Sequence, residues 1–505
     1  MNGRDLALRL LVELAKYHRI QGSSGLEDAA EFIKDQLDEL GIPNEIINYY
    51  YNREYDKFKA PIGWDLEYGE LEWNGKRITT NDSPLLVTAY SPPGEARGVA
   101  VYVGDGEDPM VNVDGKIVIA RGNPFTVYRN AVKSGAVGLL LYREDAPSEA
   151  FPYMGLFLKD NENGIPVMSI PREIVGKLTG NIVSMAVQSR YRLNAKMPVI
   201  VAGDDDASIG VISHYCHPYE TYNDNLSGTV ANILVARQAK ALHVFVPEYW
   251  GSYAFMLEKG SKLRQEAFVN LDMVGENQSI TGSTLIQINP PNFMGTPLEA
   301  LIYRSLRSIF TVNTFNNSNK VWGIRMDISN YEAGSDHDVL LSFKIPTVML
   351  NQWPDKFYHS SLDTLDKVSL EMLTGIASAV AKSINEYKEP NSDLISNYIE
   401  LKNARRRIDG TAQQPHNPPG ESLRKLFKGP IIDHQLLSNT WVMDILDESF
   451  NKSLFLSLIP ITMEYASDTG SLITMIMNEY PNANKELIMR YLTTLEELGM
   501  IKLGN

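Results

Sequence analysis

Five side chains that can bind a metal ion or carry a proton lie at turns that follow strand-like apolar segments. They are His214, Asp224, Glu248, Asp272 and His359. Imidazole and carboxylate groups supplied together by separate strand ends form a ligand set that suits Zn²⁺. If one carboxylate bridges two such ions, the ions can lie roughly 3.5 to 4 Å apart and activate a shared water molecule. The set therefore predicts a metal-dependent hydrolytic site, in which a carboxylate that binds no metal acts as general base.

Residues 213–228 supply two of these groups and also contain Cys216 and His217. Residues 207–213 alternate in the manner of a strand, and residues 229–241 carry apolar side chains at helical spacing. The polar stretch between them is therefore expected at the carboxyl end of a strand, which is where α/β sheets place their chemistry.

Each of the five groups also has an ordinary structural interpretation. Asp224 could cap the helix that follows it, and His214 could be a buried structural histidine. His359 and Glu248 could be solvated loop residues. Asp272 is harder to explain in this way, because a carboxylate among apolar neighbours needs a partner or a cation if it is buried. The combination of the five groups points to a metal site more strongly than any one of them.

Composition restricts the classes of protein to which this chain can belong. At 505 residues, with 44% hydrophobic and 22% charged residues, it is long enough for two to four globular domains. The net charge of −15 disfavours general affinity for nucleic acids, although a local basic patch stays open. No segment approaches 18 consecutive apolar residues, and residues 1–16 lack the apolar core of a signal peptide, so no membrane partner is expected. Cys216 is the single cysteine, which excludes an internal disulfide and fits a reducing compartment, so we expect a cytoplasmic protein.

The composition and the secondary-structure pattern of the sequence change along the chain and suggest four parts. Residues 1–60 and 197–400 read as one discontinuous α/β domain. Residues 61–196, with short β-rich runs separated by Gly, Pro, Asn and Asp, read as an insertion into that domain. Residues 401–420 have the composition of a linker, and residues 421–505 form a separate small domain.

Secondary-structure patterns place the polar groups within these parts. Strands in the α/β domain are expected over residues 209–213, 242–246, 267–273, 285–288 and 347–350. The sequence Ser24-Gly-Leu-Glu27 has the form of a capping box that opens a helix, and Gly41 is expected to end that helix.

The last part of the chain has a recognisable helical pattern. A helix is expected over residues 471–480, a turn over 481–483 and a second helix over 484–498, and with residues 499–503 this order resembles a winged helix-turn-helix. Residues 421–505 contain 7 Lys and Arg against 11 Asp and Glu. That balance argues against contact with phosphates and favours protein contact, so a homo-oligomer formed through this domain is one expectation.

Residues 24–380 resemble the zinc aminopeptidases of metallopeptidase family 28, whose relatives include glutamate carboxypeptidase and glutaminyl cyclase. The resemblance lies in a strand-end histidine, an Asp-Asn-Leu-Ser-Gly turn, a Leu-Asp-Met segment and a late histidine before Ser-Ser-Leu-Asp-Thr-Leu. It implies a three-layer α/β/α zinc exopeptidase domain with a mixed sheet. By the same resemblance, His214 and Asp272 bind one zinc ion, His359 binds a second ion, and Asp224 bridges the two ions.

Two further segments carry the resemblance. The β-rich insert contains Gly-Lys-Ile-Val, Arg-Gly and Ser-Gly-Ala-Val-Gly-Leu-Leu, and it resembles the protease-associated domain, a non-catalytic insert of several exopeptidase families. Gly334-Ser-Asp-His-Asp338 is similar to the Ser-Asp-His segment of the family. This similarity implies that Asp336 and His337 line the substrate pocket or support the metal ligands, whereas the ordinary interpretation is a loop with a helix cap.

The sequence departs from the family pattern at two points. The family has His-x-Asp, in which the aspartate orients the histidine, whereas here Tyr215 and Cys216 follow His214. The family also has two adjacent glutamates, one a general base and one a metal ligand, whereas the segment Val-Pro-Glu-Tyr-Trp-Gly offers only Glu248.

A single glutamate cannot serve comfortably both as base and as ligand. We favour Glu248 as the base, because a metal-bound water needs a proton acceptor if hydrolysis is to turn over. Cys216 or His217 could then supply the missing ligand, a variation that would favour a single zinc ion, so the number of ions stays open at one or two.

The function expected from these residues and this resemblance is zinc-dependent hydrolysis of an amide bond, with an aminopeptidase acting on peptides as the first candidate. Hydrolysis of a non-peptide amide, such as an acylated amino sugar, is an alternative that the same site could perform. A regulator that combines the winged helix with a degenerate peptidase-like sensor is the alternative from another class.

Overall fold

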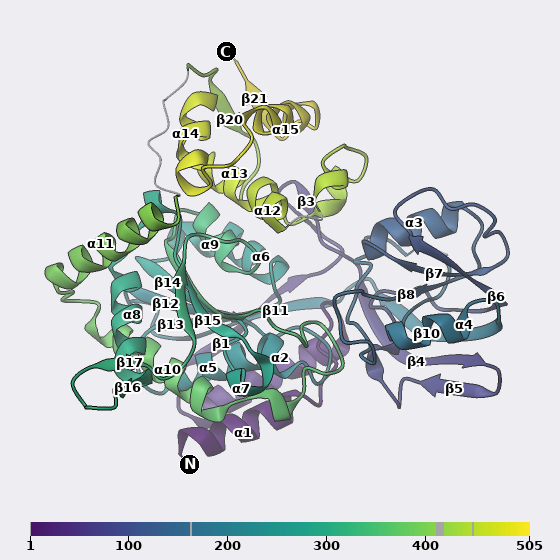
Figure 1. Ribbon diagram of the computed structural model, residues 1–505, viewed down its shortest axis with the longest axis horizontal. Helices are drawn as coiled ribbons and strands as arrows, with labels where there is room; N and C mark the ends of the chain where they lie inside the picture. The colour runs from purple at the N-terminus through teal and green to yellow at the C-terminus, as the bar shows by residue number, and fades with distance from the viewer. Residues whose placement is uncertain (1, 162–163, 411–418, 447–448, 505) are drawn as a thin grey trace.

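The fold is built on an eight-stranded mixed sheet. The computed structural model describes residues 2–161, 164–410, 419–446 and 449–504 (Figure 1). The sheet has the order β1-β11-β13-β12-β14-β19-β15-β18. Its strands are β1 (Asn44–Tyr50), β11 (Lys196–Gly203), β13 (Leu242–Val246), β12 (Ile209–His214), β14 (Ala267–Leu271), β19 (Thr347–Trp353), β15 (Thr284–Ile288) and β18 (Met326–Ser329).

The four central strands, β13, β12, β14 and β19, run parallel, and almost all of their residues are buried. Their apolar runs explain why the sequence predicted these strands, since strands covered on both faces read as continuous hydrophobic segments. In the register, His214 pairs with Val246, and Leu271 pairs with Leu350. The carboxyl ends of these strands therefore meet at one edge of the sheet.

Helices cover both faces of this sheet, as the predicted three-layer class requires. Figure 1 shows α5, α8 and α10 on one side and α6 and α9 on the other. The helices of this domain are α1 (Gly3–Leu14), α2 (Ser24–Glu39), α5 (Gly228–Ala236), α6 (Trp250–Lys259), α7 (Gln278–Thr281), α8 (Pro297–Phe310), α9 (His337–Ser342), α10 (Leu370–Glu386) and α11 (Ser392–Ile408). Two short ribbons, β2 (Glu54–Tyr55) with β3 (Phe58–Lys59) and β16 (Thr311–Asn313) with β17 (Lys320–Trp322), complete it.

The capping box predicted from Ser24 and Glu27 does not form at the start of α2. Ser23 is the N-cap, and its side chain accepts a hydrogen bond from the backbone N–H of Leu26 at 3.0 Å. Ser24 instead donates to Asp65, which lies in the insert. The sequence could not reveal this, because the competing partner is distant along the chain.

The insert has a seven-stranded sheet of its own in the order β5-β4-β10-β6-β7-β8-β9 and a separate hydrophobic core. Figure 1 shows it as a lobe beside the main sheet. Its elements are β4 (Gly63–Trp73), β5 (Lys76–Thr79), β6 (Gly94–Asp105), β7 (Ile117–Arg121), α3 (Pro124–Lys133), β8 (Gly138–Leu141), β9 (Val167–Ser169), α4 (Val175–Leu178) and β10 (Ile182–Arg192).

The C-terminal part contains the two expected helices, α14 (Thr469–Glu479) and α15 (Lys485–Glu497). They are preceded by α12 (Ser449–Lys452) and α13 (Ile459–Thr462), and β20 (Leu423–Lys425) pairs antiparallel with β21 (Ile501–Leu503). The predicted linker, residues 401–420, overlaps α11, and residues 411–418 lie outside the described part of the chain. Within the described residues, no helix combines the length and the apolar character needed to cross a lipid bilayer.

Candidate metal centre

The four predicted metal ligands lie together at the carboxyl edge of the central strands. His214 is the last residue of β12, and Asp272 directly follows β14. His214 Nε2 lies 3.3 Å from Asp272 Oδ1 and 3.4 Å from Asp224 Oδ1. His359 Nε2 lies 2.9 Å from the other oxygen of the same carboxylate, Asp224 Oδ2. Asp224 therefore lies between the two histidines with one oxygen toward each.

The ligand atoms form two groups that share Asp224. One group contains His214, Asp224 and Asp272, and the other contains His217, Asp224 and His359; within each group the ligand atoms lie within 4.8 Å of one another. His217 is thus the residue that completes the second group. His214, His217, Asp224 and Asp272 are all at most 5% exposed.

Asp224 does not act as a helix cap. It lies in a segment with non-helical dihedral angles, and α5 begins later, at Gly228. The Asp363 carboxylate accepts hydrogen bonds from the backbone N–H groups of Asn223 and Asp224, at 2.8 and 3.1 Å. These hydrogen bonds fix the turn in which Asp224 lies. Asp363 belongs to the segment that follows His359, so that segment supports the turn.

Asn225 connects the strand ends on either side of the turn. Its side-chain amide donates to the backbone carbonyls of His214 and Leu271, at 3.3 and 3.0 Å. Its amide oxygen accepts from the backbone N–H of Met273 at 3.0 Å. Because these residues flank the ligands His214 and Asp272, Asn225 holds the two strand ends at a fixed separation.

The loop that carries His217 is held by Arg19, a residue that sequence analysis did not identify. Arg19 is fully buried, and its guanidinium donates to the backbone carbonyls of Tyr215 and Tyr219 and to Thr221 Oγ1, at 2.9, 2.8 and 3.2 Å. The backbone N–H of His217 donates to the Arg19 carbonyl at 3.0 Å. These bonds support a backbone φ of +101° at His217, a conformation that residues with a side chain rarely adopt. Nothing in the local sequence around Arg19 indicates this role.

Cys216 occupies the position at which the sequence pattern expects an orienting aspartate. Its Sγ lies 3.6 Å from His214 Nδ1, the nitrogen that faces away from the ligand group. The backbone N–H of Glu248 donates to the same sulfur at 3.2 Å. Burial raises the pKa of the Cys216 thiol. The thiol therefore contacts both a predicted ligand and the turn of the predicted base.

Glu248 lies beside the ligand groups. Its Oε2 is 4.0 Å from His217 Nε2, and it groups with His214, Cys216 and His217 and not with the carboxylates. Burial raises the pKa of Glu248 well above its usual range; the charge of His214 opposes the rise, and Asp272 reinforces it. A raised pKa makes the ionised carboxylate a stronger proton acceptor.

Asp336 supports the turn of Glu248, whereas His337 contacts a different loop. The Asp336 carboxylate accepts hydrogen bonds from the backbone N–H of Tyr249 at 2.8 Å and from the Ser252 hydroxyl at 2.5 Å. Burial raises the pKa of Asp336 to about 6. His337 Nε2 lies 2.8 Å from the backbone carbonyl of Glu332. The contacts of Asp336 place it behind the base.

The chemistry of this donor set fits zinc. Three imidazoles and two aspartates are nitrogen and oxygen ligands of the kind that Zn²⁺ takes. In the described part of the chain, the ion pairs of Asp224, Asp272 and Glu248 involve only these histidines and no Lys or Arg. Buried carboxylates without a Lys or Arg partner favour a bound cation. Burial lowers the pKa of His217 to about 3, which keeps its imidazole neutral and able to bind a metal.

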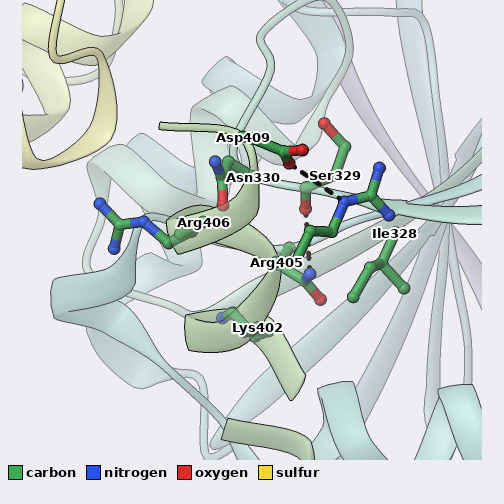
Figure 2. A pocket seen from close by; sticks show the side chains of 8 residues that line it. Ile328, Ser329, Asn330, Lys402, Arg405, Arg406 and Asp409 are labelled. Carbon is green, nitrogen blue, oxygen red and sulfur yellow. Dashed lines mark hydrogen bonds and ion pairs between the residues drawn. The ribbon is translucent and has the colours of Figure 1, made fainter. Parts of the chain in front are cut away.

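A cavity of about 100 Å³ elsewhere in the molecule is not a competing site. Its lining residues are Asn289, Ile328, Ser329, Asn330, Lys402, Arg405, Arg406 and Asp409 (Figure 2). Arg405 pairs with Asp327 and Asp409, and Lys402 pairs with Glu299 at 2.6 Å. Because acidic partners already neutralise these two cations, the cavity offers little net charge to an anionic ligand.

Comparison with known proteins shows what parts of this chain are similar to. Residues 248–384 match the sequence profile of Peptidase family M28. None of the curated proteins matches the sequence. The fold is similar to that of BSAP, a zinc aminopeptidase from Bacillus subtilis, with a TM-score of 0.57 and 20% identity over 76% of this chain and 94% of that one.

Two further solved structures share the fold. Peptidase M28 precursor from Shewanella amazonensis has a TM-score of 0.54 and 16% identity over 77% of this chain and 93% of that one. A protein from Clostridium acetobutylicum has a TM-score of 0.55 and 14% identity over 99% of this chain and 96% of that one, so the likeness extends through the C-terminal part. The family match covers the segment that carries Glu248, Asp272 and His359, and the fold brings His214 and Asp224 to the same edge. Residues 248–384 are therefore similar to peptidase family M28, and the chain has the fold of the solved zinc aminopeptidase BSAP.

Proposed function

We propose that this M28-family hydrolase is an aminopeptidase that removes N-terminal residues from peptides with two zinc ions bound around Asp224. The observation that carries the proposal is the sharing of the Asp224 carboxylate by two ligand groups, with Glu248 beside them. His214 and Asp272 would hold one ion, and His217 and His359 would hold the other. In this assignment Glu248 stays free to act as base, because His217 takes the place of the second glutamate.

Bound zinc supplies Lewis-acid activation of a water molecule and of the scissile carbonyl group. Glu248 accepts the proton of that water at a carboxylate oxygen and returns it to the leaving amine nitrogen. Asp336 keeps the Glu248 turn in place through its bonds to Tyr249 and Ser252. Cys216 contacts the outer nitrogen of His214 and thereby orients the ring.

An aminopeptidase is favoured over a carboxypeptidase by the charges around the site. A carboxypeptidase needs a free cation to bind the carboxylate of its substrate. Arg19, the buried arginine next to the His217 loop, uses its guanidinium to bind backbone carbonyls and Thr221. A zinc ion bound at this site could instead take the free amine at the start of a peptide.

The Glu248→Gln variant tests the proposal. The amide keeps the size of the side chain but cannot accept the proton, so we expect kcat for aminoacyl-amide hydrolysis to fall about 10²- to 10⁴-fold while bound zinc stays at the parent level. Glu258→Gln, on the exposed part of α6, is the matched control and should keep the parent activity. Full activity of Glu248→Gln would rule out this role for Glu248.

We also propose that the protein works in the reducing cytoplasm. Cys216 is a buried free thiol next to a metal ligand. A reducing compartment keeps such a thiol available as a hydrogen-bonding partner.

A further inference from the structure

The insert reaches the metal centre through a short segment, residues 143–153. The backbone N–H of Tyr153 donates to the carbonyl of His359 at 2.7 Å, and the backbone N–H of Ser361 donates to the carbonyl of Phe151 at 2.9 Å. The insert thus pairs with the loop that carries His359 in the manner of a short antiparallel bridge.

Side chains reinforce this pairing around the imidazole of His359. The Tyr153 ring contacts the rings of His217 and His359 edge to face, with both pairs of centroids 5.1 Å apart. The Tyr358 ring stacks on His359 at 3.8 Å. Arg143 donates to the Tyr358 carbonyl at 3.3 Å, and its guanidinium lies 5.9 Å from the Tyr358 ring. The insert therefore supplies one of the two tyrosines that contact His359, namely Tyr153, and it holds the other, Tyr358, through Arg143.

The two halves of the metal centre differ in what supports them. His359 has a backbone φ of +50°, in the left-handed region that a histidine needs outside support to keep. His214 and Asp272 instead lie at the ends of two paired strands of the main sheet, and Asn225 connects these strands. The described contacts of His214 and Asp272 come from the main domain.

We propose that Arg143 and Tyr153 of the insert position His359 for the second metal ion. Binding of that ion depends on the insert, whereas binding at His214 and Asp272 does not. The inference rests on the proposed zinc chemistry, and both residues act through His359 as positioning residues. Contacts that orient a ligand from behind typically change metal affinity 10- to 100-fold.

Zinc titration of the metal-free, full-length protein against a competing chelator tests this inference. We expect Tyr153→Ala and Arg143→Ala each to weaken the second binding step about 10- to 100-fold and to leave the first step at the parent affinity. Tyr153→Phe keeps the ring and should keep both steps. Tyr102→Ala is the matched control, because Tyr102 belongs to the insert but its described contacts are with Tyr142.

Three results would overturn the inference: equal weakening of both steps, no change in either alanine variant, or a parent chain that binds a single ion. If Tyr153→Ala fails to fold, Arg143→Ala tests the same prediction, because the Arg143 side chain is partly exposed. Peptide hydrolysis is measured separately. A parent chain that binds zinc in two steps but cleaves no peptide would contradict the proposed function and leave the inference standing.

Discussion

His217 changes how the chemistry of the site is divided among its residues. With this imidazole in the second ligand group, two aspartates and three histidines can bind metal while Glu248 remains a base. The sequence alone could not decide whether His217 is a ligand. The direction of its side chain depends on a left-handed backbone conformation and on Arg19, which lies almost 200 positions away in the chain. His214, Asp224, Asp272 and His359 could be proposed from the sequence, since each follows an apolar strand or lies in a recognisable motif.

His217→Gln tests this division directly. The amide cannot replace the imidazole as a ligand in the second group, so we expect bound zinc to fall from two ions to one and kcat to fall at least about tenfold. Metal content after dialysis and peptide hydrolysis are the measurements. His243→Gln, at another buried histidine that contacts Asn232 in the main domain, should keep both ions. Two retained ions in His217→Gln would exclude His217 as a ligand.

At the scale of elements, strands were easier to predict than the loops between them. The four parallel strands read as buried apolar runs because helices cover both of their faces. The loop between β19 and α10 is different, since its conformation depends on residues far away in the sequence. Asp363 binds the Asp224 turn, and Asp355 accepts a hydrogen bond from the Asn223 side chain at 3.2 Å.

The same loop is coupled to Glu276, which makes the stability of this region depend on pH. Burial next to Asp355 raises the pKa of Glu276 to about 9, far above the value of 4.5 for an exposed glutamate. Between pH 4.5 and about 9, the Glu276 side chain is therefore protonated in the folded chain and ionised in the unfolded chain. The stabilisation is complete below pH 4.5 and is lost as pH rises toward 9, by up to about 1.4 kcal/mol per pH unit.

Glu276→Gln should remove this dependence. The glutamine can donate permanently to Asp355, so we expect the variant to be more stable than the parent at pH 8 and similar to it near pH 4.5. Urea unfolding at a series of pH values measures the difference. A parent and a variant with parallel pH profiles would show that Glu276 does not hold a proton in the folded chain.

At the scale of the molecule, the C-terminal part contacts both other parts. Ser457 donates to the buried Asp338 at 3.1 Å, and Asp338 also accepts from the Tyr249 hydroxyl at 2.8 Å. Tyr249 follows Glu248, so two hydrogen bonds connect the C-terminal part to the turn of the base. Arg490, one of the two basic residues on α15, lies 4.0 Å from the Trp441 ring.

The insert and the C-terminal part meet through the ion pair of Lys159 and Asp433. The Asp433 side chain is only 6% exposed, so Lys159→Met would leave a buried carboxylate without its cation. We expect a loss of about 1 to 3 kcal/mol in the free energy of unfolding. Urea unfolding measures it, and the double variant Lys159→Met with Asp433→Leu should recover part of the loss. If the loss in the double variant equals the sum of the losses in Lys159→Met and Asp433→Leu alone, the pair contributes nothing beyond its separate side chains.

The sequence pattern distinguished the main domain, the insert and the C-terminal part, but the contacts between them could not be predicted from it. Lys159, Tyr153 and Ser457 lie in unremarkable local sequence, and their partners are more than 100 positions away. Such contacts depend on how finished domains pack, which local patterns do not encode.

The two hydrophobic cores imply an order of events during synthesis. Apart from Ile20, the buried core of the insert consists of residues between Ile62 and Val187. Leu6 and Ile501, which are almost 500 positions apart, instead belong to one continuous core with the main sheet. Domains with local cores can fold while the ribosome is still extending the chain. We therefore expect the insert to fold early and the main domain to wait for the last helix. A chain shortened before Ile501 would then carry all five proposed metal ligands without an assembled centre.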